Sequence, residues 1–63
     1  MRKKIEEWQK RIEVPVHGDK AKLARACRVN SRTVYEALRG MRDTENTRLV
    51  RKRALEEYNG FYY

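Results

Sequence analysis

Apolar residues recur at spacings of three and four along most of the chain, which is the period of an α-helix. The first stripe consists of Ile5, Trp8 and Ile12. Pro15 disfavours helical geometry at Val14, so the pattern predicts a first helix over about residues 2–13. Residues 14–19 are predicted to form a connector. Strand pairing is possible in this connector, but the sequence offers no evident second strand to join it.

Two shorter helices are predicted in the middle of the chain. Asp19 is a suitable N-cap for the first, over about residues 20–27, because its carboxylate can accept hydrogen bonds from the free amides of the first turn. Asn30 can cap the second, over about residues 31–39, in the same way. Gly40 then supplies the left-handed residue that commonly ends a helix.

A fourth helix is predicted over about residues 45–58, with Thr44 as its cap and Asn59-Gly60 at its end. Its apolar stripe consists of Thr47, Val50, Ala54 and Tyr58, widened by Leu49 and Leu55. Residues 61–63 follow as an aromatic tail. The predicted fold class is therefore all-α, a compact four-helix domain that spans residues 1–63.

Charge is concentrated in one part of the chain. The 63 residues carry a net charge of +7, and 40% of them are charged. Residues 20–42 alone hold seven Lys and Arg against one Glu. A localised basic surface is typical of a protein that binds a polyanion such as nucleic acid. The alternative is a solvated surface that only keeps the protein soluble.

Enzymatic and metal-dependent functions are not expected. His17 is the only histidine and Cys27 the only cysteine, which is too few for a structural metal site. No catalytic arrangement of Ser, His and Asp or of paired carboxylates is evident, and no cofactor is expected. The sequence has neither an apolar run long enough for a membrane span nor a signal-peptide pattern. We therefore expect a cytoplasmic protein without a membrane partner.

The two short helices are joined by only about three residues, so they must cross at a large angle with a small residue where they meet. The apolar positions of this segment are Leu23, Ala24, Cys27, Val29, Val34, Ala37 and Leu38. The stretch LARACRVNSRTVYEAL, residues 23–38, resembles the helix-turn-helix domain of the lambda-repressor-like and LacI-like families of bacterial and phage regulators. A looser resemblance to small phage and mobile-element regulators extends over the flanking segments. Arg28 departs from the pattern, because the family usually has a left-handed Gly there, and a non-glycine residue costs roughly 1 kcal/mol.

The resemblance implies that residues 31–39 form a recognition helix in the major groove of DNA. The positions that match the family's base readers are Ser31, Arg32, Tyr35 and Glu36. These residues also lie opposite the apolar face of the helix, so the periodicity predicts that they are exposed. Arg32 can donate two hydrogen bonds to guanine, and Glu36 can accept one from cytosine. Glu36 can instead pair with Arg32, one turn earlier, and either orient it or form a simple surface ion pair. Tyr35 can contact a thymine methyl group or a phosphate, or remain a surface aromatic.

Phosphate contacts are expected on both sides of the recognition helix. The candidates are Lys20, Lys22, Thr33, Arg39 and Arg42. One recognition helix reads too few base pairs for useful specificity, which calls for a dimer, a tandem array of sites or a partner protein, and a homodimer is expected. Its interface would involve helix 45–58, the aromatic residues Phe61, Tyr62 and Tyr63, or both. The tail can alternatively fold back over the core, against Trp8.

The sequence therefore predicts a sequence-specific double-stranded DNA-binding protein, a transcriptional regulator such as a repressor, of bacterial or phage origin. The alternatives are a DNA-binding antitoxin or an excision or architectural factor that acts mainly through protein partners. An RNA-binding module is a further alternative, although exposed aromatics on a sheet, the usual platform for single-stranded RNA, are not predicted.

Overall fold

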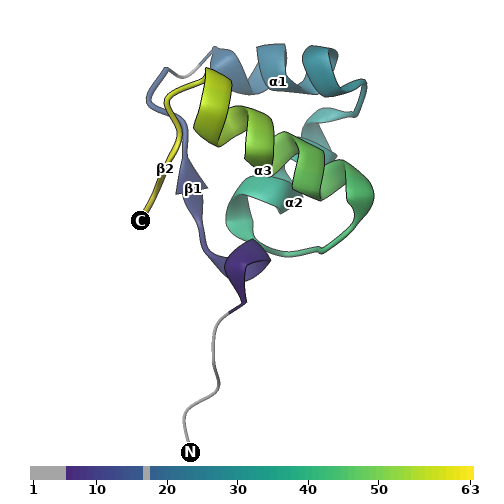
Figure 1. Cartoon of the computed structure of the whole chain (residues 1–63). Coiled ribbons are helices and arrows are strands. Elements are labelled where there is room, and N and C mark those ends of the chain that lie inside the picture. The colour runs from purple at the N-terminus through teal and green to yellow at the C-terminus, as the bar shows by residue number, and fades with distance from the viewer. Residues whose placement is uncertain (1–5, 17) are drawn as a thin grey trace, which may run out of the picture.

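In the computed structural model, which describes residues 6–16 and 18–63, the protein is compact and mostly helical. The elements in chain order are η1 (Glu7–Gln9, a 3₁₀ turn), β1 (Ile12–Glu13), α1 (Asp19–Cys27), α2 (Ser31–Arg39), α3 (Glu45–Glu57) and β2 (Phe61–Tyr62). The three α-helices pack against one another, and the two short strands lie side by side along one edge of them (Figure 1).

The predicted helix over residues 2–13 is wrong within the described residues. Glu7–Gln9 is a single 3₁₀ turn and Ile12–Glu13 is a strand, while residues 2–5 lie outside the described residues. The partner of the strand is the aromatic tail, since Ile12 is opposite Tyr62 and Glu13 is opposite Phe61 in an antiparallel pair. The four-helix expectation is thus corrected to three α-helices with a terminal strand pair. The pairing partner is about 50 residues away in sequence, and local periodicity carries no information about it.

The remaining helices begin and end within one residue of their predicted bounds. The caps at Asn30 and Thr44 are confirmed, because each side chain accepts a hydrogen bond from the backbone N–H three residues later. The cap at Asp19 is wrong. Gly18 occupies the N-cap position, and Asp19 is the first helical residue, where its carboxylate lies 3.7 Å from the ammonium group of Lys22. An acidic residue in the first turn still favours the helix through its dipole.

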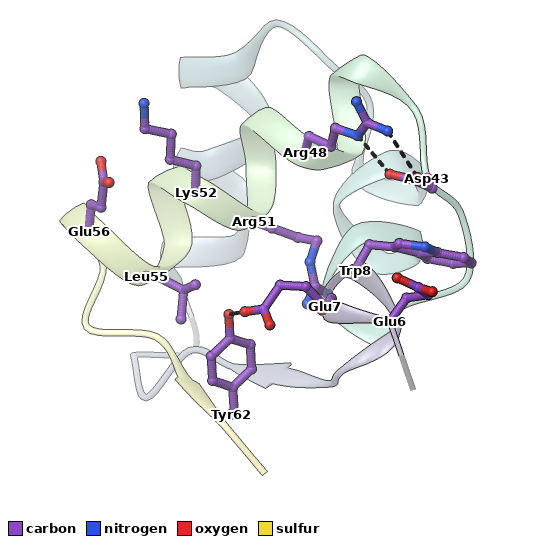
Figure 2. A pocket seen from close by; sticks show the side chains of 10 residues that line it. All are labelled: Glu6, Glu7, Trp8, Asp43, Arg48, Arg51, Lys52, Leu55, Glu56 and Tyr62. Atoms are coloured by element: carbon purple, nitrogen blue, oxygen red, sulfur yellow. Dashed lines mark hydrogen bonds and ion pairs between the residues drawn. The ribbon is translucent and has the colours of Figure 1, made fainter. Parts of the chain in front are cut away.

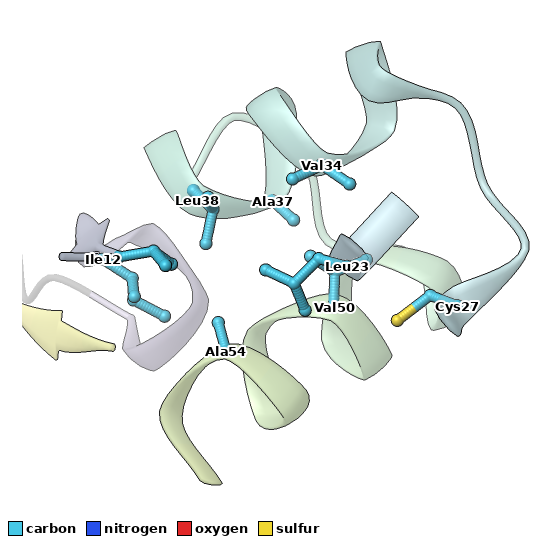
Figure 3. Close-up of a cluster of buried hydrophobic side chains, with 9 residues drawn as sticks. Ile12, Leu23, Cys27, Val34, Ala37, Leu38, Val50 and Ala54 are labelled. Carbon is cyan, nitrogen blue, oxygen red and sulfur yellow. The ribbon is translucent and has the colours of Figure 1, made fainter. Parts of the chain in front are cut away.

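The core lies where the three helices and β1 meet (Figure 3). Its buried residues are Ile12, Val14, Leu23, Cys27, Val34, Ala37, Leu38, Val50 and Ala54. Five of the seven predicted core positions of the motif are therefore buried. The other two, Ala24 and Val29, are half-buried and pack against the cluster. Cys27 has the predicted role of a small buried hydrophobe, and burial raises the pKa of its thiol.

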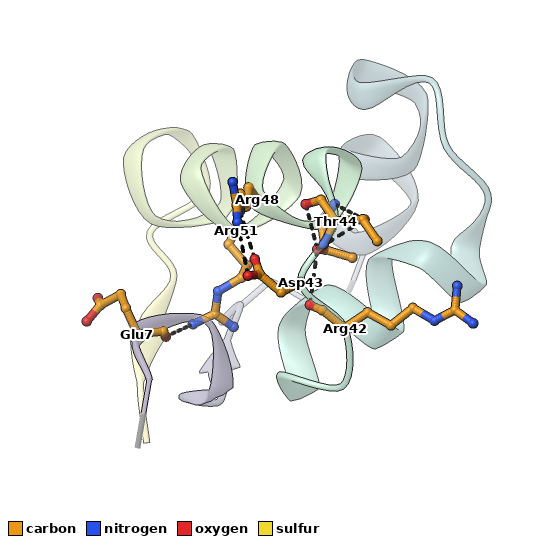
Figure 4. A network of polar contacts seen from close by, with 7 residues as sticks. Glu7, Arg42, Asp43, Thr44, Arg48 and Arg51 are labelled. Carbon is orange, nitrogen blue, oxygen red and sulfur yellow. Dashed lines mark hydrogen bonds and ion pairs between the residues drawn. The ribbon is translucent and has the colours of Figure 1, made fainter. Parts of the chain in front are cut away.

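Arg51 is a buried cation that the sequence pattern did not predict. Its side chain reaches from α3 to two other elements, donating to the backbone carbonyl of Ala37 at 2.8 Å and to that of Glu7 at 2.7 Å. Figure 4 shows the Arg51 guanidinium directed toward Glu7, beside the pair formed by Asp43 and Arg48. Arg51 therefore connects α3 to the last turn of α2 and to η1. Burial lowers the pKa of its guanidinium, which still carries its charge at neutral pH.

Candidate nucleic-acid interface

The helix α2 is fixed at both ends and divided into two faces. Asn30 Oδ1 accepts from the backbone N–H of Thr33 at 2.8 Å, and Gly40 closes the helix with a left-handed φ of 68°. The residues that face the core are Val34, Ala37 and Leu38. Ser31, Arg32 and Tyr35 are exposed, as predicted. We call these three residues together with Arg39 the outer face of α2.

The turn between α1 and α2 has the left-handed geometry that the resemblance implies. Arg28 has φ 56° and ψ 44°, although it is not a glycine. The backbone N–H of Val29 donates to the carbonyl of Ala24 at 2.9 Å, which closes α1. Because Val29 also packs against the core, the turn is held from both its backbone and its side chain. The sequence therefore tolerates the cost of a non-glycine residue at this position.

Tyr35 and Arg39 lie together on the outer face of α2. The guanidinium carbon of Arg39 is 5.3 Å from the centre of the Tyr35 ring, a cation–π distance. This contact restrains both side chains while the Tyr35 side chain stays about half exposed, at 52%. The outer face thus combines an aromatic surface with the hydrogen-bond donors of two arginines, Arg32 and Arg39.

Glu36 is less accessible than its helical position predicts. Only 15% of its side chain is exposed, against 84% for Arg32. Its Oε2 atom lies 3.9 Å from Arg32 Nε and 3.6 Å from Arg42 Nε. The pairing with Arg32 is therefore present, and a second arginine shares the same oxygen. The expectation that Glu36 is exposed is therefore wrong, and its carboxylate lies beside two arginines, one of which comes from beyond the helix.

The candidate phosphate-binding residues differ in their exposure and in their partners. Arg42 is exposed, and Figure 4 shows its side chain extending away from Asp43 and Arg48. Lys20 lies 3.9 Å from Glu13 on β1, and Lys22 is paired with Asp19. Both pairs are longer than hydrogen bonds, so the two ammonium groups keep their donors available to a phosphate.

Thr33 is the most constrained of the phosphate candidates. Its hydroxyl donates to Asn30 Oδ1 at 2.9 Å, and its backbone N–H donates to the same oxygen. The side chain is half-buried within this cap. Thr33 therefore has a local structural role at the start of α2, and the hydroxyl oxygen retains lone pairs but no free proton to offer a phosphate.

A larger hollow than the one beside α2 lies elsewhere on the described surface. A groove of about 830 Å³ is lined by residues of η1, α3 and β2, among them Trp8, Leu55 and Tyr62 (Figure 2). No residue of α1 or α2 lines it. A smaller hollow of about 310 Å³ borders Ser31, Tyr35 and Arg39. Because a recognition helix inserts into DNA as a protruding element, the larger groove does not compete with the outer face of α2 for that role.

The aromatic tail is tied to the domain through its backbone and through one side chain. Tyr62 donates a hydrogen bond from its hydroxyl to Glu7, and Lys10 lies 5.4 Å from the centre of its ring. Tyr62 and Trp8 line the same groove. The side chains of Phe61, Tyr62 and Tyr63 nevertheless remain 49%, 42% and 60% exposed. The tail folds back on the domain without burying its rings.

The described residues contain no group of three or more His, Cys, Asp and Glu side chains that could hold a metal ion. Within the same part of the chain, no helix is long and apolar enough to cross a membrane. Comparison of the sequence and structure with protein-family models, curated proteins and solved structures found no match.

Proposed function

We propose that the chain is a sequence-specific double-stranded DNA-binding protein that acts as a transcriptional regulator. The observation that carries this proposal is the division of α2 into two faces. One face buries Val34, Ala37 and Leu38, whereas the other presents Ser31, Arg32 and Tyr35 to solvent. A helix that presents donor-rich side chains to solvent and is fixed by caps and core contacts suits the major groove of B-DNA.

Electrostatics support the same face. Residues 20–42, which include α1, the turn and α2, carry all but one unit of the net charge of +7. Arg39, at the end of the outer face of α2, and Arg42, just beyond the helix, would contact phosphates. Lys20 and Lys22 would do so from the start of α1. Such contacts give affinity for any duplex, while Arg32 is the residue best suited to distinguish guanine from the other bases.

We further propose that the protein acts as a homodimer through α3, the aromatic tail, or both. Leu49 on α3 is 40% exposed, and the three rings of the tail are exposed on the same domain. A single copy of α2 offers too few contacts for useful specificity, and a dimer doubles the length of the site. The expected binding site is a palindrome with half-sites about 10 base pairs apart.

Selection of binding sites from random duplex DNA is the primary test. The wild-type chain is expected to enrich one motif, and Arg32→Ala is expected to lose the preference at one base pair of that motif. Arg11→Ala is the matched control, because it removes one exposed positive charge outside α1, α2 and α3. Enrichment of the same motif by wild type and Arg32→Ala would show that α2 is not the reader. Absence of any enriched motif would refute sequence-specific binding.

A further inference from the structure

Glu36 is placed between two arginines that come from different parts of the chain. Arg32 belongs to the first turn of α2, and Arg42 follows the helix. The end of α2 turns through Gly40, and the backbone N–H of Met41 donates to the carbonyl of Glu36 at 2.9 Å. This turn returns the chain toward Glu36. Both arginines then approach the same carboxylate oxygen, at 3.9 Å and 3.6 Å.

Exposure distinguishes the carboxylate from its two partners. The Glu36 side chain is 15% exposed, whereas those of Arg32 and Arg42 are 84% and 65% exposed. A glutamate that reads cytosine must bring its oxygen to the edge of the base. Here the carboxylate is recessed and the two guanidinium groups extend beyond it. The arrangement favours contact of the arginines, rather than the glutamate, with a ligand.

Glu36 is also the only acidic residue between positions 20 and 42, among seven basic ones. Both of its ion pairs are longer than hydrogen bonds, so the N–H donors of the arginines stay available to a ligand. An ion pair of this kind restricts two long side chains before the ligand arrives, which reduces the entropy lost on binding. The negative charge of Glu36 also offsets part of the non-specific attraction of the basic residues to phosphates.

We propose that Glu36 is a positioning residue that orients Arg32 and Arg42 together and thereby raises the selectivity of DNA binding. The inference rests on the proposed function, because it assigns Arg32 to a base and Arg42 to a phosphate. Glu36 couples the two contacts through one shared oxygen. It acts through the arginines and does not itself contact a base.

The test uses two duplexes, the one that wild type selects from a random pool and a scrambled duplex of equal composition. Glu36→Gln keeps the shape of the side chain and removes its charge. We expect the ratio of the two affinities to fall about three- to fivefold, the upper range for an exposed ion pair. Affinity for the scrambled duplex should rise, since one negative charge beside the phosphates is lost. Glu6→Gln, outside α1, α2 and α3, is the control for net charge and should leave the ratio unchanged.

A double-mutant cycle separates positioning from base reading. If Glu36 acts through Arg32, Glu36→Gln causes no further loss of selectivity in the Arg32→Ala background. If Glu36 reads a base itself, the two losses add and fall on different base pairs, which would overturn the proposal. An equal loss of affinity for both duplexes, together with a lowered melting temperature, would indicate a structural role and would overturn it too.

A measurement without DNA keeps this inference distinguishable from the proposed function. In the free protein, the NMR signals of the Nε–Hε groups of Arg32 and Arg42 should both shift in Glu36→Gln and stay in place in Glu6→Gln. Unshifted signals would overturn the shared pairing even if the wild type selects a DNA motif. A wild type that selects no motif, with both signals shifted in Glu36→Gln, would instead refute the proposed function and the selectivity role while leaving the pairing established.

Discussion

Arg32 and Arg42, beside α2, carry the same guanidinium group as Arg48 and Arg51 on α3, but the two regions hold it differently. Arg32 and Arg42 approach their carboxylate no closer than 3.6 Å. Arg48 makes two hydrogen bonds to Asp43, of 2.7 and 3.0 Å, and Arg51 donates to two backbone carbonyls. The donors on α3 are thus used within the fold, and those beside α2 remain available. Counting basic residues does not reveal this difference, whereas donor geometry does.

The largest effect is expected from Arg51→Met, which tests whether the α3 arginines are structural. The variant keeps the aliphatic stem but leaves the carbonyls of Ala37 and Glu7 without their donor. Losing one buried and one partly buried hydrogen bond from a charged group should lower the free energy of unfolding by about 3 kcal/mol. Urea denaturation followed by circular dichroism measures this change. Lys52→Met, at the neighbouring exposed position, should change stability by less than about 0.5 kcal/mol. Equal effects of the two substitutions would contradict a structural role for Arg51.

The next effect is expected at Gly40, where the last turn of α2 meets η1. Gly40 has φ 68°, and a Cβ atom there would lie 2.4 Å from the carbonyl oxygen of Gln9. Left-handed strain and this backbone collision together should make Gly40→Ala about 2 kcal/mol less stable. Gly18→Ala is the control, because Gly18 has a helical φ of −68° and nothing lies within 4 Å of its added Cβ.

Gly18→Ala should be neutral or stabilise the protein by up to about 1 kcal/mol, because it restricts the unfolded chain. The melting temperatures of the two variants should therefore shift from that of the wild type in opposite directions, or by clearly different amounts. If Gly40→Ala were as stable as Gly18→Ala, the close packing of α2 on η1 would be incorrect. The contrast between α2 and α3 would then no longer include a close contact between the end of α2 and η1.

A smaller effect distinguishes the two sets of arginines in DNA binding. Arg42→Ala should weaken binding to every duplex and reduce the slope of log K against log salt by about 1, the loss of one phosphate contact. Arg48→Ala removes an equal charge whose donors already serve Asp43, so its slope should match that of the wild type. Affinities measured by fluorescence anisotropy over a series of salt concentrations provide the test. A slope lowered equally by both substitutions would mean that net charge, rather than placement, governs binding.

The part of the fold that sequence predicted well is local. The bounds of α1, α2 and α3 follow from caps, from Gly40 and from stripes of period 3.6, all of which are encoded within a few residues. The N-terminal segment was predicted wrongly because Ile12 lies in a strand paired with the distant tail. Ile12 and Val14 are both buried in the core cluster, although they do not lie on one helical stripe. The sequence signal for a strand was the alternation of apolar Ile12, polar Glu13 and apolar Val14, which has a period of two. Glu13 is half-buried between its two buried neighbours.

In the candidate site, too, the sequence predicted only what depends on neighbouring residues. Exposure of Ser31, Arg32 and Tyr35 followed from the helical period, but the second ion pair of Glu36 is with Arg42, which lies beyond the helix. Arg51 was missed because arginine is rarely buried and only tertiary structure supplies the carbonyls that accept from it. Helical periodicity therefore identifies the face of α2, whereas the partners of its side chains require the fold.

The smallest effect concerns stability at acidic pH, and it tests how strongly Arg48 favours the ionised form of Asp43. The hydrogen bond from Arg48 lowers the pKa of the Asp43 carboxyl below its ordinary value. A carboxyl with a lower pKa in the folded state contributes stability above its unfolded pKa of about 4, and that contribution disappears as pH falls through the folded value. In urea melts between about pH 2 and pH 6, wild type should therefore lose part of its advantage over Asp43→Asn in the acidic half of the range. The difference should be small because the pair is exposed to solvent. Parallel curves would show that Arg48 does not favour the ionised form of Asp43 in solution. Arg48 would then be as free to bind a ligand as Arg42, and the contrast between the two regions would rest on Arg51 alone.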